Sequence, residues 1–333
     1  MIEQCSRVTV YCRYFNGSRH EIGAPFETQI FPDTIAYCSR RFRAKYMSLT
    51  LTEDEIPQPP VKIIDRKMAN PHHNFTVCMA PLYGDEPKWL QIAEFMEHYK
   101  LQGATMVYIW VGWVEDYTKR ILEDYEKRGE AEIFWLYDQY PKNDYYWHNV
   151  EIQGCFLHTK RISKWTAVVD LDERLILADH TRPLIGYMNH LYRPDIATLI
   201  FRQQYIIKTE SSPEYYIDDR QTEEFMPTQR YHNSSSFGPP MFVTKSIVQM
   251  DKVAVLSIHK VLRYYGYYTD HQLTPEEGYV KHYRYVKTNN FTKFRLSQVE
   301  KLGEFSVTSL EPSYSKKLVD NTVNRVRHVY KNI

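Results

Sequence analysis

The chain has 333 residues, which is long enough for one large α/β domain with extensions or for two domains. Its 42 basic and 41 acidic residues nearly cancel, so the charge gives no support to bulk nucleic-acid binding. The longest uncharged apolar-rich stretch, 101–114, is too short to span a membrane, and Met1–Cys5 lacks the basic start and apolar core of a secretory signal.

The first sixty residues alternate short β-like runs with turn residues. Val8–Tyr14 and Tyr46–Leu51 are typical of strands. The Pro-rich segment Ile56–Pro60 follows them and marks a boundary. Residues 1–60 are therefore expected to form a small β-rich N-terminal extension.

From residue 74 onward, strand-like and helix-like segments alternate. Strands are predicted at 75–82, 106–111, 132–136 and 165–169, and helices at 89–101, 117–127 and 150–161. Strands that alternate with helices at this spacing imply right-handed crossovers and a parallel sheet. The expected fold class is α/β, with a mainly parallel sheet flanked by helices.

The strand Trp165–Val169 ends abruptly at three carboxylates within four residues. Asp170 and Asp172 are two residues apart, so on an extended segment their side chains point the same way. Ligands of open α/β sheets bind beyond the carboxyl ends of the strands. Two convergent carboxylates suit Mg²⁺ or Mn²⁺ held together with substrate phosphates. The motif predicts a metal–diphosphate site, whereas the simpler interpretation of such a triplet is a pair of solvated carboxylates.

Beyond residue 195 the alternation of strands and helices loosens. Strand-like pieces are expected at 196–201, 241–243 and 252–255, separated by polar loops. Residues 319–330 have the pattern of a closing helix.

The cysteines and the glycosylation sequons bear on the cellular compartment. One pair among the three N-terminal cysteines can be bridged in an oxidising lumen. Cys78 and Cys155 are expected to be small buried hydrophobic residues. Four sequons exceed the one or two expected by chance in about this length of chain, and they indicate a luminal chain: Asn16, Asn74, Asn233 and Asn290.

Four blocks of sequence, in order along the chain, carry a family resemblance. They are Phe75–Gly84, Trp89–Ala104, Ser163–Arg174 and His282–Arg284. Together they extend over roughly residues 62–290, which is more specific than any single motif. In these blocks the chain resembles glycosyltransferase family 92.

The resemblance implies a GT-A fold, which is Rossmann-like, and an inverting transferase. Such an enzyme would move a sugar, expected to be galactose, from a UDP-sugar to a glycan or glycoprotein acceptor with Mn²⁺ or Mg²⁺ as cofactor. It also implies a single-pass type II membrane protein of the Golgi lumen, with an N-terminal anchor that this chain does not include. On this plan residues 61–300 form the transferase domain, with a donor half at 74–175 and an acceptor half at 176–300, and residues 301–333 form a C-terminal helical segment.

The resemblance also assigns site residues. The family's Asp-x-Asp falls on Asp170 and Asp172, and both are expected to serve the metal and the donor. A histidine from the far half is expected to complete the metal shell, with His282 as first candidate and His259 as the alternative. The other donor-binding candidates, placed by analogy to the fold or at a phosphate oxygen, are Pro81, Leu82, Tyr83, Asp138 and Arg284.

The catalytic base and two competing functions remain open. Displacement at the anomeric carbon needs a carboxylate to take the proton of the acceptor hydroxyl, and the candidates are Asp251, Glu224 and Asp219. One competing function is a catalytically inactive, secreted glycan-binding relative. The other is a haloacid-dehalogenase-type phosphatase, whose motif would lie near the chain start and would carry Thr or Val where this chain has Arg174.

Overall fold

The computed structural model describes residues 7–31, 35–65, 70–84, 86–136, 144–191, 193–285 and 290–331. The chain divides into two compact units, residues 1–69 and 70–333. The first unit thus extends somewhat beyond the Pro-rich boundary at residue 60, and residues 301–333 belong to the second unit. Asp138 lies outside the described residues.

The N-terminal unit is an antiparallel sheet, as the alternation of β-like runs and turns predicts. Its strand order is β2-β1-β3-β4. A disulfide between Cys12 and Cys38 ties the central strand to the segment that precedes β3, which confirms a bridge among the N-terminal cysteines. The strands are β1 (Thr9–Phe15), β2 (Phe26–Gln29), β3 (Tyr46–Thr50) and β4 (Val61–Lys62).

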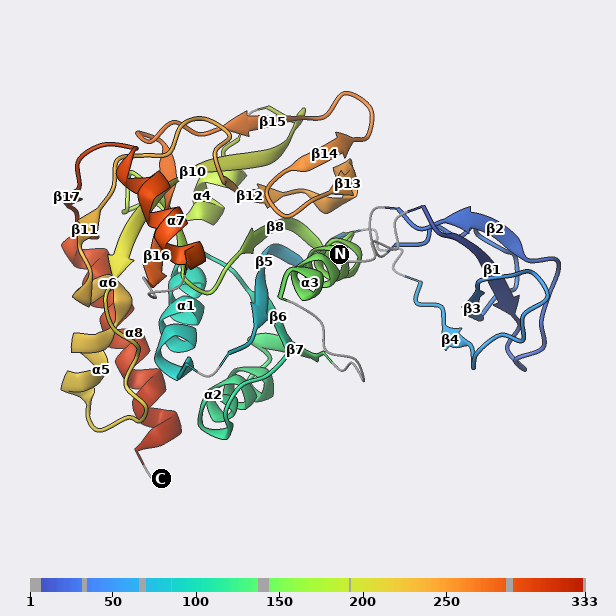
Figure 1. Ribbon diagram of the computed structural model, residues 1–333, viewed down its shortest axis with the longest axis horizontal. Helices are drawn as coiled ribbons and strands as arrows, with labels where there is room; N and C mark the ends of the chain where they lie inside the picture. The colour runs from blue at the N-terminus through green and yellow to red at the C-terminus, as the bar shows by residue number, and fades with distance from the viewer. Residues whose placement is uncertain are drawn as a thin grey trace. The chain divides into compact units, whose positions relative to one another are not determined.

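The second unit is built around one large mixed sheet (Figure 1). Its core strands run in the order β8-β5-β6-β7 and are all parallel, which confirms the predicted α/β class. These strands are β5 (His73–Leu82), β6 (Met106–Val111), β7 (Ala131–Trp135) and β8 (Ser163–Val169).

The later strands extend this sheet beyond β8. Strand β12 pairs antiparallel with both β8 and β10, and β10 pairs parallel with β16, which in turn pairs antiparallel with β9. The strands that extend the sheet are β9 (Glu173–Leu177), β10 (Ile196–Lys208), β11 (Asn233–Ser234), β12 (Lys245–Val248), β15 (Thr269–Gln272), β16 (Gly278–Tyr285) and β17 (Ser306–Val307). Strands β13 (Val253–Leu256) and β14 (Val261–Tyr264) pair with each other in a separate two-stranded sheet.

Helices cover both faces of the parallel core. Phe75, Val77 and Met79 point from β5 into the apolar core that it shares with α1, α2 and α8. Cys78 points to the opposite face and meets α3. None of the described helices is long and apolar enough to cross a membrane. The helices are α1 (Trp89–Leu101), α2 (Asp116–Lys127), α3 (Asp144–Thr159), α4 (Leu184–Asn189), α5 (Asp219–Phe225), α6 (Pro227–Arg230), α7 (Asn290–Glu300) and α8 (Pro312–Tyr330), with a short 3₁₀ turn η1 (Met250–Lys252).

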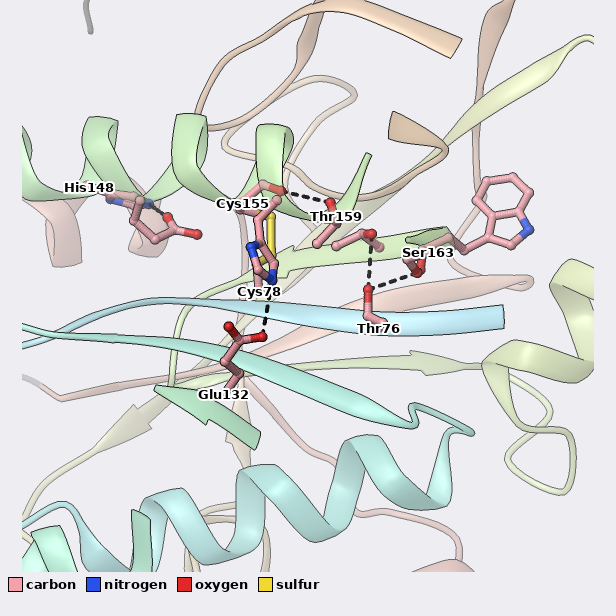
Figure 2. The surroundings of a disulfide bond; sticks show 11 residues. Thr76, Cys78, Glu132, His148, Cys155, Thr159 and Ser163 are labelled. Atoms are coloured by element: carbon pink, nitrogen blue, oxygen red, sulfur yellow. Dashed lines mark hydrogen bonds and ion pairs between the residues drawn. A yellow bond between two sulfur atoms is a disulfide. The ribbon is translucent and has the colours of Figure 1, made fainter. Parts of the chain in front are cut away.

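The contact between α3 and β5 is covalent. Cys155 of α3 forms a disulfide with Cys78 of β5, and their Cα atoms lie 6.0 Å apart (Figure 2). The Cα atoms of Cys12 and Cys38 lie 5.9 Å apart. The expectation that Cys78 and Cys155 are buried is confirmed, but they are joined in a disulfide that the sequence did not predict. Their separation of 77 residues hides the pairing, because only the packing of α3 on the sheet brings them together.

The predictions beyond residue 195 were less accurate. Strand β10 continues to Lys208, past the predicted end at residue 201. No strand forms at residues 241–243, where Met241 and Val243 instead have positive φ angles of 61° and 44° in a turn. Three apolar residues in a row therefore do not make a strand here, because the backbone turns directly before β12.

Candidate metal centre

The Asp-x-Asp motif lies at the carboxyl edge of the parallel core. Val169 is the last residue of β8 and pairs with Met79 of β5, so the ends of both strands reach the same edge. Asp170 follows directly, and the backbone N–H of Glu173 donates to its carbonyl oxygen at 3.1 Å. The motif is thus a tight connection from β8 to β9. Its backbone is also fixed from outside by the N–H of Tyr283, which donates to the carbonyl of Asp172 at 2.8 Å.

Asp170 is held by a buried lysine of the same chain. Lys245 begins β12 beside the end of β8, and its Nζ lies 2.7 Å from Asp170 Oδ1 and 3.1 Å from Glu173 Oε2. Burial alone would lower the pKa of Lys245, but the two carboxylates raise it above its usual value. Lys245 is therefore a permanent cation at this end of the motif. Sequence reasoning missed it, because no motif surrounds it.

Glu173 connects the two ends of the motif. Its Oε2 accepts a hydrogen bond from the backbone N–H of Asp170 at 2.8 Å, and its Oε1 accepts one from Gln203 Nε2 at 2.9 Å. Burial and the neighbouring charge of Asp170 raise the pKa of Glu173 to about 7, although Lys245 acts in the opposite direction. Glu173 thus serves as a buried acceptor that orders both Asp170 and Gln203.

Helix α3, on which Figure 2 shows His148, brings further titratable groups to the Asp170 side. His148 Nε2 lies 3.9 Å from Asp170 Oδ1 and 3.9 Å from Glu151 Oε2. Glu151 is fully buried, and neither of its oxygens has a hydrogen-bond partner among the described residues. Burial, reinforced by Asp170, raises the pKa of Glu151 well above its usual value. Burial likewise lowers the pKa of His148, so the neutral forms of both groups are favoured.

His259, the alternative metal ligand, also belongs to the Asp170 side. Burial, together with the nearby ammonium of Lys245, lowers the pKa of His259 to about 4. Its carbonyl oxygen accepts a hydrogen bond from Thr244 Oγ1 at 3.2 Å. The imidazole is thus neutral near Asp170, but Lys245 already occupies the position against that carboxylate.

Asp172 has a different set of neighbours, all from β10 and β16. His282 Nε2 lies 3.2 Å from Asp172 Oδ2, and Arg284 Nη1 lies 3.8 Å from the same oxygen. Burial would raise the pKa of Asp172, but His282, with Arg284 and Lys208, holds it well below its usual value. The structure therefore brings together Asp172, His282 and Arg284 across more than a hundred residues of sequence.

The geometry around Asp172 fits a divalent cation. Two atoms at adjacent positions of an octahedral ion, each about 2.1 Å from the metal, lie about 3 Å apart. The Asp172 and His282 atoms are separated by 3.2 Å. His282 Nδ1 is 2.9 Å from Gln203 Oε1, which fixes the ring with Nε2 directed at Asp172. A carboxylate and an imidazole oriented by a neighbouring amide are a suitable donor set for Mn²⁺ or Mg²⁺.

A second cluster of ligand-type residues is unsuited to a metal. Among the described residues, Cys78, Cys155 and Glu151 place their ligand atoms within 4.8 Å of one another. The two sulfur atoms are joined in the disulfide. A disulfide offers no thiolate, which is the form of cysteine that binds metals.

The predicted nucleoside-binding residues lie at the same edge as the Asp-x-Asp turn. Pro81 and Leu82 end β5 and are buried, whereas Tyr83 follows the strand with 41% of its surface exposed. The irregularity between Met79 and Leu82 in the pairing with β6 turns this segment at the end of the strand. Tyr83 is the member of this group that a ligand at the edge can reach.

The three candidate bases make their contacts elsewhere. Asp219 is paired with Arg327 of α8, and Glu224 with Arg230. Asp251 lies on η1, after β12 has run antiparallel to β8 toward the beginning of that strand. Asp251 is thus at the opposite edge of the sheet from Asp170. Among the residues that the structure describes, these carboxylates do not contact the Asp-x-Asp turn, so they are not assembled with the candidate metal centre.

Comparison with solved structures gives only remote likenesses. S. aureus TarS 1-349 in complex with UDP-GlcNAc is 12% identical, with coverage of 78% of this chain and 74% of that chain and a TM-score of 0.32. HddC from Yersinia pseudotuberculosis is 11% identical, with coverage of 68% and 98% and a TM-score of 0.26. An apo-UDP-glucose pyrophosphorylase is 12% identical, with coverage of 78% and 99% and a TM-score of 0.30. At these TM-scores the likenesses carry no argument.

The comparison with family models is decisive. None of the curated proteins compared with the sequence matches it. The model of glycosyltransferase family 92, however, matches residues 73–318, which include β5, the Asp-x-Asp turn and His282. Because this match spans well over half of the sequence, the chain belongs to glycosyltransferase family 92.

Proposed function

We propose that this glycosyltransferase is inverting and metal-dependent, and that it moves a sugar from a UDP-sugar to a glycan acceptor. The observation that carries the proposal is the pairing of Asp172 with His282 at 3.2 Å, with the imidazole oriented by Gln203. Galactose is the donor sugar that the family resemblance favours. Mn²⁺ or Mg²⁺ is the proposed cofactor.

The chain's own residues would divide the work at the carboxyl edge of the sheet. Asp172 and His282 would hold the divalent cation, which when bound supplies neutralisation of the leaving diphosphate. Arg284, 39% exposed at its side chain, would contact a phosphate oxygen. Asp170, fixed by Lys245, would orient the donor next to the turn. Tyr83 would contact the nucleoside at the end of β5.

The proposed location is the Golgi lumen. Both described disulfides suit an oxidising compartment. The sequon asparagines Asn74 and Asn233 are exposed and accessible to glycosylation. Expression in a secretory host should therefore yield a protein whose mobility shifts after removal of N-glycans, and an unchanged mobility would contradict the luminal location.

The function is best tested with a panel of nucleotide sugars. Donor hydrolysis is measured in Mn²⁺, in Ca²⁺ and after chelation, with Asp172→Asn as the matched inactive control. We expect turnover of a UDP-sugar that needs the divalent ion and favours Mn²⁺, since phosphate oxygens are expected to share a small site. Full activity after exhaustive chelation would show a metal-free transferase. Glycan binding without any turnover would support the inactive relative.

A further inference from the structure

One buried lysine next to the metal centre lacks a hydrogen-bonding partner. Lys208 is the last residue of β10 and is only 4% exposed. Among the described residues, none accepts a hydrogen bond from its ammonium, and no carboxylate lies within the 4.0 Å of an ion pair. Lys245 and Lys281, which are equally buried, each donate a hydrogen bond of 2.7 Å. The side chain of Lys208 is thus buried, while its ammonium keeps N–H donors for solvent or a ligand.

The charges around Lys208 place it at the metal centre. The groups that act on it are Asp172 from the motif, Glu86 from the segment between β5 and α1, and Glu94 from α1. Glu94 is already bound by Arg174, at 3.1 Å, and by Thr228. Burial outweighs the carboxylates and lowers the pKa of Lys208, which is the direction expected of an ammonium that lacks a close anion.

Lys208 and Arg284 together surround Asp172 with positive charge. The parallel register of β10 and β16 pairs Ile207 with Arg284 and Lys208 with Tyr285, so both cations lie at the ends of neighbouring strands. Both lower the pKa of Asp172. The carboxylate of Asp172, which also faces His282, thus has two further cations near it. The two cations and the N–H donors of Lys208 match an anionic ligand that bears several oxygen atoms.

We propose that Lys208 is a fixed cation for the diphosphate of the donor and binds it independently of the divalent ion. A phosphate oxygen would give the ammonium the acceptor that it lacks, and lysine acts there as a point charge. The identity of the ligand as a nucleotide diphosphate rests on the proposed function. The affinity of the carboxyl edge of the sheet for a diphosphate group in the absence of metal does not depend on that function.

The test uses inorganic pyrophosphate and calorimetric titration in excess chelator, so that no metal contributes. We expect the unaltered protein to bind pyrophosphate and Lys208→Met to bind it about 10- to 100-fold more weakly, since hydrogen bonds to charged groups have about this effect. Lys208→Arg should recover part of the affinity. Lys281→Met is the matched control, because it removes an equally buried ammonium whose partner is Thr308, and it should leave pyrophosphate affinity within about twofold.

Thermal unfolding of the ligand-free variants completes the test. Lys208→Met should melt close to the temperature of the unaltered protein, because the substitution breaks no hydrogen bond or ion pair among the described residues. Absence of metal-free pyrophosphate binding, or equal binding by Lys208→Met, would overturn the inference. Loss of pyrophosphate binding in Lys208→Met, in a protein that hydrolyses no nucleotide sugar, would uphold the inference and reject the proposed function.

Discussion

The two aspartates of the motif are two residues apart, yet they differ in what neutralises them. Asp170 is held at 2.7 Å by Lys245, a cation that the chain itself supplies. Asp172 faces an imidazole at 3.2 Å, with Arg284 further away at 3.8 Å. A carboxylate that already has a buried ammonium offers little to a metal ion. Against the effect of burial, Asp172 raises the pKa of His282, so a metal ion would have to replace the proton on Nε2 for the pair to offer a coordination site.

From this difference we infer a mainly structural role for Asp170 and a ligand-binding role for Asp172 within the same turn. The Asp170 side, with Lys245 and Glu173, joins β8, β9 and β12 and is a closed network. The Asp172 side, with His282, Arg284 and Lys208, presents ligand atoms and excess cations. We therefore expect changes on the Asp172 side to affect metal and donor, and changes on the Asp170 side to affect stability first.

The largest effect is expected for Asp172→Asn. Loss of the ligand carboxylate should lower turnover by about two to three orders of magnitude, which is typical when a group that stabilises developing charge is removed. The fold should remain intact, with some loss of stability, because the folded state lowers the pKa of the carboxylate that is removed. Steady-state kinetics at saturating Mn²⁺, together with a melting curve, measure both. An unchanged rate at saturating metal would remove Asp172 from the metal centre.

Substitution of each candidate histidine in turn tests which side of the turn would hold the metal. His282→Ala should raise the Mn²⁺ concentration for half-maximal rate about 10- to 100-fold, the range seen when metal ligation is disturbed. His259→Ala should leave it nearly unchanged, because His259 lies beside Lys245. A Mn²⁺ titration of both variants decides between them. If only His259→Ala weakens the metal dependence, the assignment of the two sides is reversed.

Asp170→Asn should act mainly on folding. Lys245 would keep Glu173 as its partner at 3.1 Å, so the unfolding free energy should fall by about 1–3 kcal/mol rather than by the larger loss of a fully uncompensated buried charge. The drop in turnover should be smaller than that of Asp172→Asn. Chemical denaturation and kinetics on the same preparations give both values. Equal kinetic losses without destabilisation would make the two aspartates equivalent.

The smallest effect on activity is expected from removal of the Cys78–Cys155 disulfide. It anchors α3, which carries His148 to the Asp170 side, whereas His282 lies on β16. The Cys78→Ala/Cys155→Ala double variant should lose about 2–4 kcal/mol of stability. Its half-saturating Mn²⁺ concentration should remain within about twofold of that of the unaltered protein. A large change in metal affinity would show that α3 supports the Asp172 side as well.

The local pattern of apolar residues was enough to predict most helices and strands of the parallel core. The helix α1 and the strand β6 begin and end where the apolar periodicity predicts, because their burial is a property of contiguous residues. Helix α3 begins at Asp144, six residues before its apolar pattern suggested, since its first turns lie toward the edge of the sheet. The β9, β12 and β16 strands were missed, because each is short or interrupted by charged residues that the site buries.

The sequence by itself determined the α/β class, the position of the Asp-x-Asp turn at the end of a buried strand, and His282 as a candidate partner. These follow from side chains close together in the chain, or from motif order along it. Only the tertiary structure decided that Lys245 belongs to Asp170, that Gln203 orients His282, that Cys78 pairs with Cys155 and that Lys208 lacks a partner. Each of these contacts depends on strand register or on helix packing between distant segments. The spacing of residues along the chain encodes neither the register nor the packing.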